Sequence, residues 1–117
     1  MARVSLDGEN LVVDIEGIDR LWALKSRVVV PLDKVRGVTA DAGAVKEPKG
    51  LRAPGLHVPG VVVAGTFHQD GERVFWDVHD PAKAVVIELA GQHYARLVVG
   101  VADPRATVAM IESATRA

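Results

Sequence analysis

The sequence predicts a mainly β, barrel-like domain of about seven antiparallel strands that ends in one C-terminal α-helix. Valine is abundant and aromatic residues make up only 4% of the chain, a composition that favours strands. Four strand-like runs follow one another between Val61 and Gly100, separated by the turn-rich segments QDGE, DPAK and GQH. Asp103 and Pro104 then supply an N-cap and a first-turn proline, so a helix is expected to begin there.

The N-terminal part of the chain predicts a hairpin and two further strands. Strands are expected over 3–6 and 11–15, because the tetrad DGEN between them is typical of a tight turn. Arg27–Pro31 and Lys34–Asp41 are also strand-like, with an interruption at the proline, which cannot donate a ladder hydrogen bond. A chain of 117 residues is expected to form a single domain over 1–117.

Residues 42–60 are expected to form a long loop. The segment holds three prolines and four glycines and shows no hydrophobic periodicity. Long loops on a rigid scaffold often contain binding residues, and a glycine-rich backbone adds N–H groups that can hold an anion. We therefore define a candidate binding loop for an anionic membrane surface or a phosphate: Lys46, Lys49, Arg52 and His57. The alternative is a surface crossover whose charged side chains are only solvated.

A two-residue turn at Asp70-Gly71 predicts the faces of the strands on either side of it. The expected cross-strand pairs are Gln69–Glu72, His68–Arg73, Phe67–Val74 and Gly65–Trp76. Alternation then gives one core face, which consists of Val61, Val63, Phe67, Val74, Trp76 and Val78. The other face consists of Val62, Thr66, His68, Arg73, Phe75, Asp77 and His79. Val62 and Phe75 are expected to be exposed there and form a candidate interaction face.

The last two strands and the helix predict a second set of core residues. Alternation places inward Val85, Ile87 and Leu89, against Leu97, Val99 and Val101. In the helix, Val108, Ile111 and either Ala114 or Thr115 recur at intervals of three or four residues. This apolar stripe is expected to dock on the sheet.

The four histidines do not predict a metal site. His68 and His79 share a face, but six residues along the strand separate them by roughly 20 Å, whereas zinc ligands all lie about 2.0–2.2 Å from one ion. His57 and His93 have no carboxylate or histidine at helical spacing, so all four are interpreted as solvated surface residues. The chain has no cysteine, no G-x-S-x-G motif and no phosphate-binding glycine loop. We therefore expect no catalytic residue, no metal and no cofactor.

Three segments and the final helix carry a family resemblance: VVVPLDKVRGV, GLRAPGLHVPG and GTFHQDGERVFWDVHDPAKAVVIELAGQHYARLVVGVADP. Together they resemble a bacterial pleckstrin-homology-like (PH-like) domain family over nearly the whole chain. The resemblance implies a barrel of two packed antiparallel sheets, capped by the C-terminal helix. It also implies peptide, protein or self-association rather than catalysis. Pleckstrin-homology domains that bind phosphoinositides use basic residues of the first hairpin, whereas this hairpin, VSLDGENLVVD, is acidic.

These observations predict a non-enzymatic interaction domain that binds another protein or itself. The alternatives are a carrier for a small apolar ligand and a module that binds an anionic membrane or a phosphate through the candidate binding loop. Net charge is −1, with a positive excess only over residues 20–52. Nucleic acid is therefore not expected as a partner, while a homo-oligomer is. The absence of cysteine and of any long apolar segment predicts a cytoplasmic location.

Overall fold

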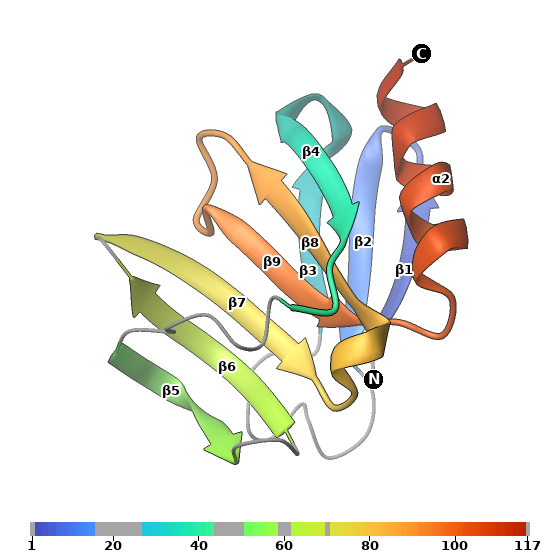
Figure 1. Ribbon diagram of the computed structural model, residues 1–117. Coiled ribbons are helices and arrows are strands. Elements are labelled where there is room, and N and C mark those ends of the chain that lie inside the picture. The colour runs from blue at the N-terminus through green and yellow to red at the C-terminus, as the bar shows by residue number, and fades with distance from the viewer. Residues whose placement is uncertain (1, 16–26, 44–50, 59–61, 70, 117) are drawn as a thin grey trace.

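The computed structural model describes residues 2–15, 27–43, 51–58, 62–69 and 71–116. These ranges contain strands β1 (Ala2–Asp7), β2 (Asn10–Ile15), β3 (Arg27–Pro31), β4 (Val35–Ala40), β5 (Leu51–Val58), β6 (Val62–Gln69), β7 (Glu72–Val78), β8 (Ala84–Leu89) and β9 (Arg96–Gly100). They also contain the short 3-10 helices η1 (Leu32–Lys34) and η3 (Pro81–Lys83) and the α-helix α2 (Pro104–Arg116). The fold is mainly β, with two sheets and a C-terminal α-helix (Figure 1).

The three-stranded sheet consists of the N-terminal hairpin and one further strand. β1 and β2 are antiparallel, with Asp7 opposite Asn10, so Gly8 and Glu9 form the turn. Gly8 has a φ of +61°, which glycine adopts without the strain that a Cβ atom causes. β3 pairs with the other side of β2. The hairpin predicted at the N-terminus is confirmed.

The six-stranded sheet has the strand order β4-β8-β9-β7-β6-β5. Its neighbouring strands are antiparallel except β7 and β9, which are parallel, with Phe75 opposite Leu97. The expectation of wholly antiparallel strands is therefore wrong at this pair. β9 runs antiparallel to β8 and lies between β8 and β7. This position makes it parallel to β7.

Part of the loop expected over 42–60 is a strand. β5 pairs antiparallel with β6 and lies at one edge of the six-stranded sheet. The register shifts between Arg52 and Gly55, so Pro54 lies at an irregularity of an edge strand, where its missing N–H is tolerated. The loop prediction is wrong for residues 51–58, because pairing with β6 determines this strand and local pattern does not reveal such pairing.

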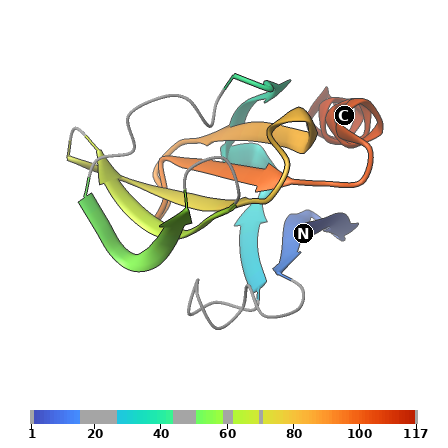
Figure 2. The same cartoon turned by 60° about the horizontal axis from the view of Figure 1, so that its bottom comes forward.

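Neither sheet closes into a barrel within the described residues. A barrel requires that the first and last strands of a sheet pair, whereas β4 and β5 lie at opposite ends of the six-stranded order. The three-stranded sheet covers one face of the larger sheet, and α2 lies beside β4 and β8 (Figure 2). The predicted barrel is therefore corrected to two open sheets and a helix, with nine described strands where about seven were expected.

Apolar side chains are buried on both faces of the six-stranded sheet. The first cluster lies between the two sheets and α2 and includes Leu11, Val13, Val28, Val30, Phe75, Val85, Ile87, Tyr94, Leu97, Val99 and Ile111. The second cluster includes Phe67, Val74, Trp76, Val78, Ala84 and Val98. β7 contributes alternate residues to both clusters, as expected of a strand whose two faces are covered.

The register predicted around the Asp70-Gly71 turn is confirmed. All four expected pairs occur, namely Gln69–Glu72, His68–Arg73, Phe67–Val74 and Gly65–Trp76. The described members of the predicted core face, Phe67, Val74, Trp76 and Val78, are buried. The predicted pairing of β8 with β9 is also confirmed, with Ile87 opposite Leu97.

Phe75 is a correction to the predicted exposed face. Its side chain is 0% exposed and its ring lies 5.5 Å from that of Tyr94. Alternation predicts the correct face for Phe75, but the expectation of solvent exposure is wrong at this position, because the three-stranded sheet and Tyr94 cover this part of the face. Phe75 is therefore unavailable to a partner of the folded chain.

The C-terminal helix begins where the sequence predicts. The Oδ1 atom of Asp103 accepts a hydrogen bond from the backbone N–H of Ala106 at 3.1 Å, the geometry of an N-cap. Ile111 is fully buried and Val108 packs partly against the same cluster, so the predicted stripe docks on the sheet. No helix in the described part of the chain is long and apolar enough to cross a membrane.

Candidate functional site

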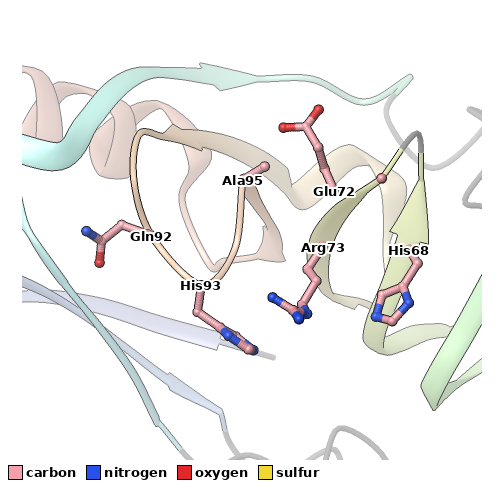
Figure 3. A pocket seen from close by; sticks show the side chains of 7 residues that line it. His68, Glu72, Arg73, Gln92, His93 and Ala95 are labelled. Carbon is pink, nitrogen blue, oxygen red and sulfur yellow. The ribbon is translucent and has the colours of Figure 1, made fainter.

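A polar hollow lies at one end of the six-stranded sheet, between the β6–β7 turn and the loop that joins β8 to β9 (Figure 3). Its volume is about 360 Å³. The described residues that line it are His68, Gly71, Glu72, Arg73, Gln92, His93 and Ala95. Most of these side chains are polar or charged, and His68, Arg73 and His93 are exposed, so a solute can reach them.

Backbone hydrogen bonds hold the β8–β9 loop beside the beginning of β7. The N–H of Ala95 donates to the carbonyl oxygen of Arg73 at 2.8 Å. The N–H of Leu89 donates to the carbonyl oxygen of Ala95 at 2.9 Å. These two bonds place one end of the loop between β7 and β8, so residues far apart in sequence share one hollow.

Tyr94 links the same loop to the buried face of β6 and β7. Its side chain is 5% exposed, and its hydroxyl lies 3.2 Å from the Oγ1 atom of Thr66. Its ring packs on Phe75 with the two planes tilted by 58°. The loop is therefore held in place by a buried polar contact and a buried aromatic contact.

Three nitrogen-bearing side chains lie on one side of the hollow. His68 is opposite Arg73 in the β6–β7 register, so alternation puts both on one face and Glu72 on the other. Figure 3 shows the side chains of His93, Arg73 and His68 pointing to this side, whereas the carboxylate of Glu72 points away. We call His68, Arg73 and His93 the cationic row, after the guanidinium of Arg73.

The guanidinium of Arg73 is available to an external anion. Within the described residues it makes no hydrogen bond and no ion pair, unlike Arg27, whose Nε donates to Asp14 Oδ1 at 2.7 Å. A guanidinium presents five N–H donors in a planar fork that matches a carboxylate or phosphate. The two imidazoles of the cationic row add ring nitrogens to this set of potential donors.

The described residues contain no group of three or more His, Asp or Glu side chains placed to hold a metal ion. The hollow brings together two histidines, His68 and His93, that the sequence interpretation treated separately. Its carboxylate, on Glu72, points to the other side of the ribbon. One guanidinium and two imidazoles on one side of the hollow offer N–H donors to an anion.

Only two residues of the candidate binding loop, Arg52 and His57, lie in the part of the chain that the structure describes. Lys46 and Lys49 lie outside the described residues. Arg52 and His57 lie in β5, opposite Phe67 and Val63 respectively. Of the candidate interaction face, Val62 is in β6 opposite Val58, and Phe75 is buried in the core.

Sequence reasoning missed the cationic row, although one part of it was accessible. The hairpin register already put His68 opposite Arg73 on one face. The sequence predicts only that His93 lies at a turn, because no local pattern shows where the loop after β8 packs. Searches against protein-family models, curated proteins and solved structures found no match for this chain.

Proposed function

We propose that this chain is a non-enzymatic binding domain that recognises an oxyanion group, either a phosphate or a carboxylate, at the cationic row. The observation that supports this most is the position of Arg73. Its guanidinium is exposed and unpaired among the described residues, and it lies in one hollow with two imidazoles. Charge-assisted hydrogen bonds of this kind are stronger than neutral ones.

The exposure of the cationic row sets the expected affinity. Ion pairs at exposed positions contribute about 0–1 kcal/mol each, so a free anion should bind with a dissociation constant of about 1 mM or weaker, equivalent to about −4 kcal/mol. Tighter binding requires a larger ligand that carries the anion and makes further contacts around the hollow.

The test is an NMR titration with inorganic phosphate and, separately, with acetate, at constant ionic strength. Backbone amide shifts are expected to move at Arg73, His93 and Ala95. Arg73→Gln should weaken binding about fivefold, the factor that corresponds to about 1 kcal/mol. The matched control is Arg105→Gln, because Arg105 is exposed on α2 and is not part of the hollow. Equal binding by the two variants would contradict the proposal.

The same two variants identify the source of the anion. Vesicles of phosphatidylserine that sediment with the wild-type chain and with Arg105→Gln, but not with Arg73→Gln, would assign the oxyanion to a lipid headgroup. Binding of free phosphate or acetate without vesicle binding would assign it to a soluble ligand. The vesicle experiment also tests binding to an anionic membrane surface, which is one of the alternatives from the sequence analysis.

Self-association is a second candidate function, supported by the edge strands of the two described sheets. β4 and β5 are the edge strands of the larger sheet, and β1 and β3 those of the smaller one. Val29 on β3 is 50% exposed, and open edges favour pairing with another chain. Size-exclusion chromatography with light scattering tests this, and a monomer at high concentration would exclude it.

The remaining alternatives receive less support. A carrier for a small apolar ligand needs an apolar cavity, whereas the hollow described above is lined mainly by polar side chains. A second, larger hollow between the β1–β2 turn, η1 and the end of α2 has a mixed lining that includes Glu9, Asn10 and Asp33 beside Pro31, Leu32 and Ala114. The resemblance to the PH-like family stays a prediction. Two sheets and a C-terminal helix accord with it, but the parallel β7–β9 pair departs from the antiparallel sheets that it implies.

A further inference from the structure

Tyr94 is a buried residue that lies next to the cationic row. Thr66 pairs with Phe75 across β6 and β7, and His68 pairs with Arg73 one step further along the same face. The hydroxyl of Tyr94 contacts Thr66 and its ring contacts Phe75. Tyr94 therefore packs on the pair Thr66–Phe75, and the next pair on the same face, His68–Arg73, belongs to the cationic row.

His93 connects Tyr94 with the hollow, because it contacts Tyr94 and lines the hollow. Its ring meets the ring of Tyr94 edge to face, with centroids 4.8 Å apart and planes at 82°. Such edge-to-face contacts are a favoured geometry between rings. Because Tyr94 is held at its hydroxyl and at its ring, its contact with His93 restricts where that imidazole can lie.

We propose that Tyr94 is a positioning residue for anion binding: its hydroxyl contact with Thr66 holds the β8–β9 loop so that His93 lies beside Arg73. This inference rests on the proposed function, since it assumes that His93 takes part in binding. A binding group is effective only if its side chain is held near the productive geometry by surrounding contacts. Thr66 and Phe75 supply those contacts here.

The inference distinguishes the hydroxyl of Tyr94 from its ring. Tyr94→Phe keeps the ring between Phe75 and His93 and removes only the contact with Thr66. Thr66→Ala removes the other partner of the same contact from β6, without changing the loop. If the contact positions His93, both variants should weaken phosphate binding by a similar factor, roughly two- to fivefold, as is usual for coupled groups in contact.

A double-mutant cycle tests whether the effect passes through His93. Phosphate dissociation constants are measured by NMR for the wild type, Tyr94→Phe, His93→Ala and the double variant. We expect Tyr94→Phe to weaken binding in the wild-type background and to have no further effect when His93 is alanine. A residue that is only structural would weaken binding equally in both backgrounds, and that result would overturn the inference.

Arg73→Gln separates failure of this inference from failure of the proposed function. If Arg73→Gln leaves phosphate binding unchanged, the proposed function fails and the inference fails with it. If Arg73→Gln weakens binding but Tyr94→Phe and Thr66→Ala do not, only the positioning role is wrong. Amide spectra of each variant identify any loss of fold, and Thr66→Ala replaces Tyr94→Phe if the latter does not fold.

Discussion

Replacement of Phe75 by alanine tests the burial of the face that alternation alone left open to solvent. The side chain is 0% exposed and its ring lies 5.5 Å from that of Tyr94. Removing a buried phenylalanine in this way usually costs about 3–5 kcal/mol, and aromatic pairs contribute about 0.5–1.5 kcal/mol beyond area burial. We expect Phe75→Ala to lower the free energy of unfolding by about 4 kcal/mol.

Urea unfolding followed by circular dichroism measures this loss. With an m-value of about 1.5 kcal/mol per molar urea, a typical value for small domains, the midpoint should fall by about 2.7 M. Domains commonly have a stability of about 5–15 kcal/mol, so the variant should remain folded without urea across most of that range.

Val29→Ala is the matched control, because it also shortens an apolar strand residue. Val29 is 50% exposed, and substitutions at such surface positions usually change stability by no more than about 0.5 kcal/mol. If Phe75→Ala costs less than about 1 kcal/mol, similar to Val29→Ala, the burial of this face is refuted. The exposed interaction face predicted from alternation would then be restored.

Two further substitutions test the turn and cap chemistry. Asp103→Ala should remove the N-cap of α2 at a cost of about 1 kcal/mol and lower the melting temperature by about 4 °C, and an unchanged melting curve would contradict the cap. Gly71 has a φ of +79° and open space where an alanine would place its methyl group, so Gly71→Ala should lose about 1–2 kcal/mol through backbone strain alone. Gly37 also has open space but no positive φ, so Gly37→Ala should be neutral or stabilising by about 0.4–1 kcal/mol. Equal urea midpoints for the two glycine variants would refute the strain argument.

Pairing of neighbouring strands was predictable where a short turn joins them. The Asp70-Gly71 turn leads to the pairs His68–Arg73 and Gly65–Trp76 because a two-residue connection leaves one register for the flanking strands. The N-terminal hairpin follows the same rule. The helix start at Asp103 was also predictable, since the capping interaction joins residues only three apart.

Contacts between distant segments were not predictable in the same way. The prolines and glycines of residues 51–58 predict a loop, because they are untypical of a strand and pairing with β6 stabilises the strand that forms there. The parallel β7–β9 pair depends on where β9 inserts. Local sequence does not determine either arrangement, because both depend on hydrogen bonds between backbones rather than on side-chain periodicity.

The candidate site also contains one part that the sequence predicts and one part that it does not. One pair of the cationic row, His68 and Arg73, follows from the hairpin register alone. The third member, His93, joins them because the backbone of Ala95 bonds to Arg73 and Tyr94 is buried against Thr66. The basic residues of the candidate binding loop drew attention by composition, whereas the observed hollow depends on how a short loop folds back on β7.

Local sequence was enough to establish that the chain is mainly β, which residues of the central hairpin share a face, and where the C-terminal helix begins. These properties depend on alternation, turn length and capping, which act over a few residues. Three other properties emerged only from the folded chain: which face is covered, in which order the strands lie, and that His93 lies in one hollow with Arg73. They depend on long-range packing of the three-stranded sheet and of the β8–β9 loop, which no local pattern encodes.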